Sequence, residues 1–509
     1  MWFKRKKEVE TPQPVVKPYR PRRAYHNNAK NRVLDNVRMS HDLGGVPSRV
    51  LGEYGNGLNN VSINAVLRQS LTAVRSACRQ LSIDNPYARR YVVLTSSSVC
   101  GADGITVRPQ PLLDATVNQQ LADTLEKLFY DWAQDASRFS FDGSMSLDLF
   151  QQTVERTRAI DGESFIRIRK GKGLQLEIID SARVPSTKNE LLKNGAYISN
   201  GIEFNSDNVV QAYWIANVHP LNYTISTNDL VRIPADEIIH YFIPEYASQQ
   251  RGIPDLIASI KTLHDFNAFH EASIIQKRIA SSAMAFITNQ DTTVDPLYDG
   301  QEEEREHTEF FDPGKIYELK AGQNIQTVSP SAGTDGLQAF TDSVLTTISV
   351  GLGVTKMNLT GDTSNASFSA AKMSDRIQRD GMKTKSNLMI SKVLKPIYKL
   401  WLADVMITKL NGLSFKDFDS ISNSTYILPK QISLDPNKDA QYEQTLVDMG
   451  VKSKSMVIRD LGYEPNKVFE EIEHEQKINN NMDNVQGMNN NDNQTQKPDA
   501  GDENTASTK

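Results

Sequence analysis

The stretch from residue 254 to residue 286 restricts the fold of this chain more than any other. Pro254 stands where a first helical residue is tolerated, and apolar residues then recur at helical spacing, at Leu256, Ile257, Ile260, Leu263, Ile274, Ile275, Ile279 and Ala283. A helix over this stretch would be about 50 Å long at 1.5 Å per residue. Because so long a rod exceeds the usual globular helix, it must pack against something equally long, in its own chain or in a neighbour. We expect five residues to carry that packing: Leu256, Ile260, Leu263, Ile274 and Ile279.

Before this helix, the spacing of the apolar residues changes from a helical to a strand-like pattern. Residues 146–160 predict a shorter helix, and residues 161–245 then hold short apolar or alternating runs separated by Gly, Asn and Asp. Such runs are typical of short strands joined by turns. The sequence therefore predicts an α+β fold in which a β-rich block interrupts two helices.

Other segments complete this outline. Helical periodicity occurs over residues 61–81, 85–101, 117–135, 337–352 and 367–410, and again in two or three short pieces near 439–475. Within the segment 367–410, Gly381 and Pro396 are expected weak points or kinks of the helix. Residues 102–111 read as a turn and a strand, and residues 314–330 as two strands about a turn.

A polar stretch, "LGVTKMNLTGDTSNASFSAAK", joins two of these helical segments between Leu352 and Lys372. It is rich in Ser, Thr, Asn and Gly, and it contains no His or Cys. Long polar loops between helices tend to be functional or disordered. This one lacks the reactive groups that catalysis would need.

Composition and charge narrow the class of protein. The 509 residues are 39% hydrophobic and 23% charged, with a net charge of −5, so two to four globular domains are expected. No apolar run approaches the roughly 18–20 residues that span a bilayer. No apolar segment follows the charged start "MWFKRKKEVE", so secretion is not expected. Two cysteines, Cys78 and Cys100, cannot build a disulfide framework, and a reducing cytoplasm is the default compartment.

The two ends of the chain carry opposite charge. Residues 1–50 hold twelve Lys and Arg against four Asp and Glu, whereas residues 470–509 hold nine Asp and Glu against three Lys. We expect a disordered basic arm over residues 1–45 and a disordered acidic tail over residues 476–509. The arm could touch nucleic acid or a scaffold protein through Lys4, Arg5, Lys6, Lys7, Arg20, Arg22 and Arg23.

A search for catalytic motifs gives little. The P-loop, H-E-x-x-H and G-x-S-x-G patterns are absent from the sequence, and no cofactor, metal site or catalytic residue is predicted. Asp161 and Glu163 lie two residues apart. On a strand they would share a face and could bind a metal or work as an acid–base pair. The alternative is a plain polar turn between a helix and a strand.

Several stretches taken together resemble the lambda-type portal proteins of tailed bacteriophages. They include "AIDGESFIRI", "VVQAYWI", "IPADEIIHYFIPEYASQQRGIPDL", "GKIYELKAGQNIQTVSP" and "ISVGLGVTKMNLTGDTSNASFSAAK". They keep the order of the family over roughly residues 60–475. An acidic insertion near residues 291–311 and the Asn-rich tail depart from it.

The resemblance implies a portal fold made of wing, stem, clip and crown. Residues 46–145 and 288–350 would belong to the wing, residues 146–160 and 254–286 would be the stem helices, and residues 161–245 the β-rich clip. The tunnel loop would fall at 351–370. Residues 371–475 would complete the wing and the crown.

The function that the resemblance implies is structural. Twelve subunits would form a ring at one capsid vertex of the virion, after assembly in the host cytoplasm, and double-stranded DNA would pass through it. The implied partners are the large terminase subunit, the major capsid or scaffold protein and a head-completion adaptor, with no membrane. The residues expected to face the DNA channel are Lys356, Asn358, Thr360, Thr363, Ser364 and Asn365.

Two alternatives remain open at this point. One is a metal-dependent enzyme acting on nucleic acid through Asp161 and Glu163. The other is a different head–tail connector component, although a smaller adaptor would not need a helix as long as the one expected after residue 254.

Overall fold

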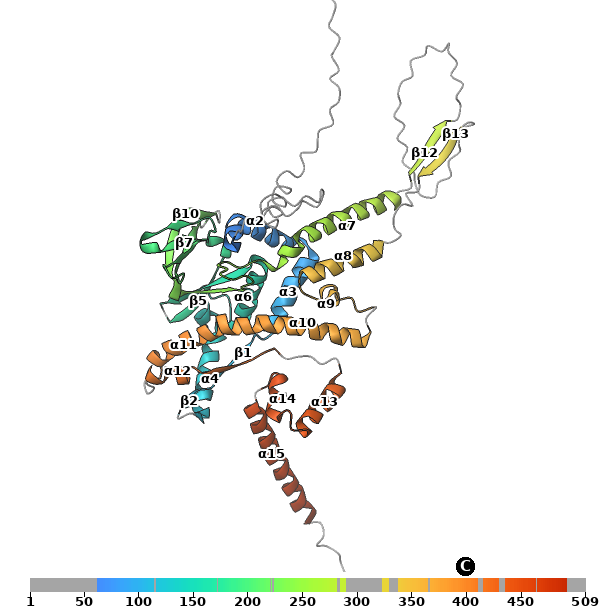
Figure 1. The fold of residues 1–509 in the computed structure, drawn as a ribbon. Coiled ribbons are helices and arrows are strands. Elements are labelled where there is room, and N and C mark those ends of the chain that lie inside the picture. The colour runs from blue at the N-terminus through green and yellow to red at the C-terminus, as the bar shows by residue number, and fades with distance from the viewer. Residues whose placement is uncertain are drawn as a thin grey trace, which may run out of the picture. The chain divides into compact units, whose positions relative to one another are not determined.

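The computed structural model describes residues 62–113, 116–171, 173–219, 221, 224–281, 284–289, 323–328, 337–364, 367–410, 415–429, 435–463 and 465–491. By its internal contacts the chain divides into two units, Met1–Ser62 and Ile63–Lys509, and all elements below belong to the second. They mix helices and antiparallel strands (Figure 1), which confirms the α+β class. The basic arm predicted for residues 1–45 lies outside the described residues.

Four helices in the first third of this unit follow the predicted periodicity. They are α2 (Ile63–Asp84), α3 (Pro86–Cys100), α4 (Gln119–Ala133) and α6 (Leu147–Asp161), with the short α5 (Ala136–Phe139) between the last two. Asn85 begins α3 because its side-chain oxygen accepts hydrogen bonds from the backbone N–H groups of Tyr87 and Ala88, as an N-cap does. Helix α3 packs between α2 and α6.

The β-rich block consists of two antiparallel sheets. The first has the order β11-β4-β5, from β4 (Glu163–Lys170), β5 (Leu174–Ile179) and β11 (Ile238–Phe242). The second has the order β10-β9-β8-β7-β6, from β6 (Glu190–Leu191), β7 (Tyr197–Ser199), β8 (Ile202–Phe204), β9 (Val210–Val218) and β10 (Ile225–Pro234). The 3₁₀ turns η1 (Ser181–Arg183) and η3 (Ala235–Glu237) connect the two sheets, and η2 (Lys193–Gly195) lies between β6 and β7.

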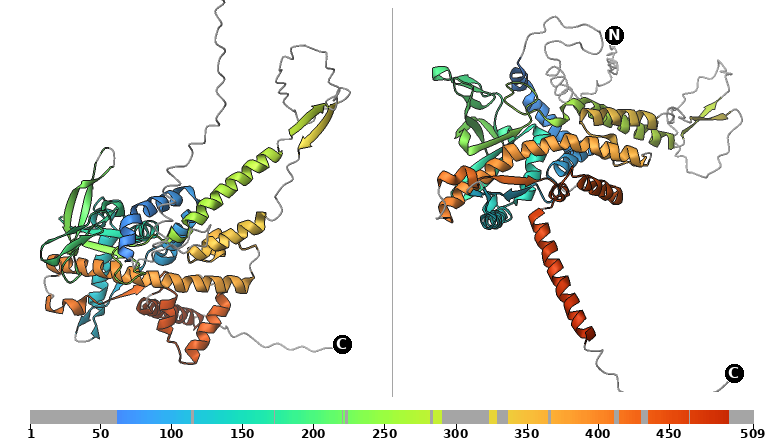
Figure 2. Two further views of the ribbon diagram at one scale, coloured as in Figure 1. Left: turned by 45° about the horizontal axis from the view of Figure 1, so that its top comes forward. Right: turned by 60° about the horizontal axis from the view of Figure 1, so that its bottom comes forward.

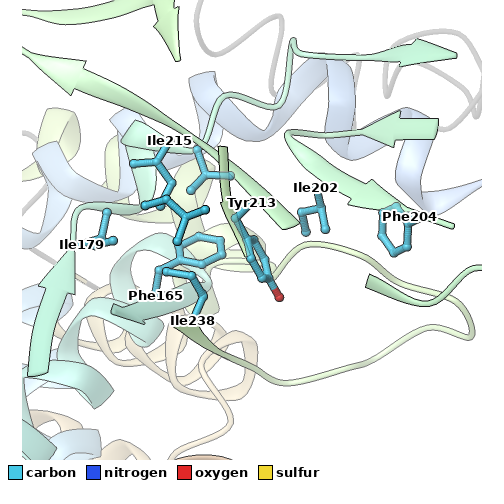
Figure 3. Packing of buried hydrophobic residues seen from close by; sticks show 9 residues of the cluster. Phe165, Ile179, Ile202, Phe204, Tyr213, Ile215 and Ile238 are labelled. Atoms are coloured by element: carbon cyan, nitrogen blue, oxygen red, sulfur yellow. The ribbon is translucent and has the colours of Figure 1, made fainter. Parts of the chain in front are cut away.

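One apolar cluster joins the two sheets. Figure 3 shows Phe165 of β4 and Ile238 of β11 beside Tyr213 and Ile215 of β9. Phe165 and Tyr213 meet edge to face, with ring centroids 5.7 Å apart. Successive side chains of a strand point to opposite faces of its sheet. The alternating apolar residues that predicted these strands therefore lie on one face and form the common core.

The predicted long helix is shorter than expected. Residues 255–259 form a 3₁₀ turn, η4 (Asp255–Ser259), and the α-helix α7 runs from Ile260 to Ser281, about 33 Å. The predicted end at residue 286 is wrong, because residues 284–289 form strand β12 (Met284–Asn289), which pairs with β13 (Gln323–Val328). The sequence of β12, "MAFITN", is as apolar as the helix before it. For this reason the predicted helix extended into the strand.

The expected packing residues of this helix behave differently along its length. Leu256, Ile260 and Leu263 are buried, but Ile274 is 51% exposed, and the surroundings of the Ile279 side chain lie outside the described part. Helix α8 (Leu337–Gly351) lies beside α7, as both views in Figure 2 show. Within the described part of the chain, α7 packs against α8 and also contacts α2, and neither helix covers Ile274.

The longest helical rod lies later in the chain. Helix α10 (Phe368–Met389), the π-helical turn η5 (Ile390–Leu394) and helix α11 (Lys395–Thr408) follow one another without a break, over about 60 Å (Figure 2). The helix passes through Gly381 uninterrupted. The irregularity falls just before Pro396, whose missing N–H removes one helical hydrogen bond.

A second core joins this rod to α4. The aromatic rings of Phe129, Trp132, Tyr398 and Trp401 contact one another, with the Phe129 and Trp401 centroids 5.1 Å apart. Strand β1 (Thr106–Pro109) pairs antiparallel with β14 (Ser424–Ile427), which follows η6 (Phe415–Asp417) and α12 (Phe418–Ile421). Strands β2 (Leu112–Leu113) and β3 (Thr116–Val117) form a small hairpin.

The C-terminal part holds the expected short helices, α13 (Pro436–Asp448) and α14 (Lys454–Asp460), followed by the longer α15 (Pro465–Asn491). The disordered tail predicted from residue 476 is thus wrong up to residue 491, where the helix continues. Among the described residues, no helix is both long enough and apolar enough to cross a lipid bilayer.

Candidate functional site

The polar stretch between α8 and α10 is folded rather than an open loop. Leu352 and Val354 are buried, and Thr355 then caps a short helix, α9 (Lys356–Thr360). Leu359, which is 1% exposed, anchors this helix, and α9 packs against α3. The apolar residues scattered through the stretch explain why part of it folds back onto the protein.

Three of the six predicted channel residues lie on α9, and each is bonded to its own chain. The ammonium group of Lys356 lies 2.7 Å from a carboxylate oxygen of Asp342 on α8. The amide of Asn358 donates to Gln378 on α10 over 2.6 Å, and the hydroxyl of Thr360 donates to the Lys356 carbonyl. The only cation between residues 351 and 370 is therefore paired with a carboxylate.

The next four residues form an exposed segment of the stretch. Gly361 ends α9 in the left-handed region, with φ of 75°, and residues 361–364 are all exposed. Asp362 accepts hydrogen bonds from the backbone N–H and the hydroxyl of Ser364, and these bonds lower the pKa of Asp362. Thr363 lies between them, whereas Asn365 lies outside the described residues.

Asp161 and Glu163 do not share a strand face. Asp161 is the last residue of α6, Gly162 reverses the chain with φ of 88°, and Glu163 begins β4. Asp161 binds Arg79, with 2.7 Å between Nε and Oδ1. The fully buried Glu163 contacts Arg75 of α2 at 2.8 Å, Arg251 at 2.9 Å and His240 of β11 at 3.0 Å.

This arrangement contradicts the metal-binding alternative. The Glu163 oxygens are occupied by two guanidinium groups, an imidazole and the backbone N–H of Gly252, which leaves no room for a metal ion. Burial alone would raise the pKa of Glu163, but Arg251 and His240 hold it well below its usual range. Within the described ranges, no group of three or more His, Cys, Asp or Glu could bind a metal ion.

A second buried charge cluster lies next to the first. Arg158 of α6 makes a two-fold contact with Asp255 of η4, both bonds 2.8 Å long, and also binds Glu155. Asp255 in turn accepts bonds from Tyr91 of α3 and Lys385 of α10. The two clusters connect the helical elements to the start and the end of the β-rich block.

The sequence identified the segments of this network but not its purpose. "AIDGESFIRI" contains Glu163 and "RGIPDL" contains Arg251 and Asp255, and both stretches carry the family resemblance. Their pairing has no local signal, because 88 residues separate Glu163 from Arg251. Arg158 stands in an ordinary helical pattern, in which nothing marks a buried charge.

The protein is expected to lose stability in two steps as the pH falls. Burial lowers the pKa of His240, against the effect of its bond to Glu163, so the neutral ring belongs to the folded state. Stability gained from a depressed pKa is lost as the pH falls below the unfolded value, about 6.5 for His and about 4.3 for Glu. The melting temperature should therefore decline below about pH 6.5 and further below about pH 4.3.

Thermal unfolding between pH 8 and pH 4 checks this expectation. Replacing His240 with Gln should flatten the melting temperature between pH 7.5 and pH 5.5, because the titrating ring is gone. His474→Gln, at an exposed position of α15, serves as the control and should keep the slope of the unaltered chain. Equal slopes in all three proteins would show that His240 does not govern this range.

Comparison with known proteins defines the class first. A curated relative, the "Probable portal protein" of Halomonas phage phiHAP-1, is 24% identical over 417 residues, which are 80% of each chain. The family description "Phage portal protein, lambda family" matches residues 56–384. The class is that of the phage portal proteins. Within it, the chain belongs to the lambda family.

Two solved structures match this chain at low sequence identity. The neck of a native GTA particle, described with C12 symmetry, is 14% identical and covers 77% of this chain and 93% of its own, with a TM-score of 0.45. An HK97-family phage portal protein from Corynebacterium diphtheriae is 11% identical and covers 67% of this chain and 98% of its own, with a TM-score of 0.31.

Proposed function

We propose that this portal protein forms a ring, expected to have twelve subunits, at one vertex of the capsid, and that double-stranded DNA passes through the ring during packaging and ejection. Assembly takes place in the host cytoplasm and the ring stays in the virion. Membership of the lambda portal family supports this function. The proposed partners are the large terminase subunit, the major capsid or scaffold protein and a head-completion adaptor.

The proposed parts of each subunit are assigned to consecutive segments of the chain, and the stem helices take the bounds of the elements described above. Helix α6 and helix α7 with its preceding turn are the proposed stem helices, the β-rich block over 161–245 is the clip, and 351–370 is the tunnel loop. Residues 46–145 and 288–350 belong to the wing, and 371–475 to the wing and crown. The clip is the proposed docking site of the terminase motor. Because the chain has no P-loop of its own, the work of packaging must come from a separate ATPase.

The observation that carries the DNA-channel role is the neutral character of the polar stretch. Each Lys or Arg that contacts a phosphate adds counterion-release affinity, which would hold DNA in place. Both cations of the stretch are paired, Lys356 with Asp342 and Lys372 with Asp439. The exposed residues Thr363 and Ser364 present hydroxyl groups. Hydroxyl groups contact phosphate oxygens weakly and without reading sequence, which suits a surface along which DNA slides.

Electron microscopy of the purified protein tests the ring. Top views should show a closed ring with a central hole wide enough for duplex DNA, and light scattering should give a mass many times the 57.0 kDa of one chain. A protein that remains monomeric, or that forms only filled particles, would contradict the proposal.

Replacing Thr363 and Ser364 with Asp tests the channel role. The two carboxylates should repel DNA phosphates and lower the amount of DNA packaged at least several-fold, while ring assembly stays intact. Thr124→Asp, at an exposed position of α4, is the control and should package normally. Normal packaging by the double variant would remove the 361–364 segment from the DNA path.

A further inference from the structure

Helices α13–α15 form a C-terminal helical unit, residues 435–491, that has little core of its own. No described residue of α13 or α14 is buried. Large apolar side chains are exposed instead along the unit: Tyr442, Met449, Val451, Met456, Leu461, Tyr463, Phe469, Ile472 and Ile478. So many exposed apolar residues in so short a segment mark an interaction surface.

Exposed ion pairs join this unit to the rest of its own chain. Lys372 of α10 pairs with Asp439 of α13, and Lys467 of α15 pairs with Glu126 of α4. Both lysines are about half exposed, and surface pairs of this kind contribute little to stability. Because most helical stability in proteins comes from packing of an apolar face, another surface must cover these helices.

The free charges of the unit indicate which surface that is. Lys454 and Arg459 of α14 are exposed and make no ion pair within the described part of the chain. On α15, Glu470, Glu471 and Glu475 line one surface hollow with Lys467 and His474. Cations on one helix and carboxylates on another make the unit complementary to a second copy of itself in a head-to-tail contact, which closes into a ring when the rotation permits.

We propose that the C-terminal helical unit of each subunit packs against the same unit of its neighbours, with the α15 carboxylates of one copy facing the α14 cations of the next. The exposed apolar side chains of both copies are covered by this contact. The inference rests on the proposed ring, to which it assigns a specific contact between subunits.

Charge reversal in the full-length chain tests this contact. An acidic-face variant changes Glu470, Glu471 and Glu475 to Lys, and a basic-face variant changes Lys454 and Arg459 to Glu. Each should lower the affinity of assembly at least tenfold, read as a fall in mass by light scattering toward that of one chain. Combining both sets of changes in one chain should restore the oligomer, because the charges are again opposite.

The control reverses three exposed carboxylates elsewhere, Asp123, Asp131 and Asp207, so that the net charge changes as in the acidic-face variant, and assembly should persist. Circular dichroism should show unchanged helix content in every variant. Full assembly of both single-face variants, or failure of the combined variant to recover, would overturn the contact while the ring proposal stands. A monomeric parent protein would instead contradict the ring itself.

Discussion

Replacing Glu163 with Gln is expected to lower the free energy of unfolding by about 3–5 kcal/mol, the usual effect of removing one partner from a buried ion pair. The carboxylate is fully buried and faces Arg75 and Arg251, whose side chains are 6% and 0% exposed. Without it, two guanidinium groups remain in a site that water does not reach. The cost of such uncompensated charge exceeds the loss of the hydrogen bonds themselves.

Chemical denaturation followed by tryptophan fluorescence measures this effect. Glu190→Gln removes a carboxylate of the same type from an exposed pair with Lys188, and its unfolding curve should match that of the unaltered chain. If Glu163→Gln unfolds at the same denaturant concentration as this control, the buried cluster does not stabilise the fold in the way inferred here.

The second large effect is expected from a single methyl group at Gly252. A Cβ atom at this position would fall on the carbonyl group of Gly162 and lie 2.9 Å from the Cβ of Glu163. A Cβ at Gly162 would in turn lie 2.7 Å from the carbonyl oxygen of Gly252. The neighbour in each case is backbone, which cannot rotate away, so Gly252→Ala should destabilise the protein by about 3 kcal/mol or more.

Gly381→Ala is the matched control for this variant. Gly381 lies inside α10 with open space around it, and Ala favours a helix over Gly by about 0.5–1 kcal/mol. The same substitution should therefore stabilise the protein at one glycine and damage it at the other. A Gly252→Ala protein that melts at or above the temperature of the unaltered chain would show that the two backbones can separate without cost.

Both predictions concern the joint at which the β-rich block leaves the helices and returns to them. The chain leaves through Gly162 and Glu163 and comes back through Arg251 and Gly252, and these four residues contact one another. Asp255 and Arg158 continue the joint into η4 and α6. The β-rich block is thereby attached to α6 and η4 by a short buried segment.

Much of the secondary structure could be predicted because its causes are local. The helical period fixed α6 to within a residue, with the left-handed Gly162 as its end, and the strand period identified the β-rich block. Errors occurred where apolar character continued across a change of element, as from α7 into β12. They also occurred where a polar composition hid a few buried anchors, as Leu359 does in α9.

The candidate site could be predicted only in part, for a related reason. The sequence identified the polar stretch and its lack of reactive groups, but four of the six chosen residues are bonded within the subunit. The pairing of Lys356 with Asp342 depends on how α8 and α9 turn toward each other. No periodicity records the direction of such a turn.

By itself, the sequence determined the types of most elements and their order, because the spacing of apolar side chains and the turn residues act over a few positions. It also carried the resemblance to the lambda portal family. Tertiary structure alone decided the partners: Glu163 with Arg251, the Gly162 backbone with that of Gly252, and β1 with the distant β14. Periodicity shows which face of an element is apolar, whereas the path of the whole chain selects the surface that face meets.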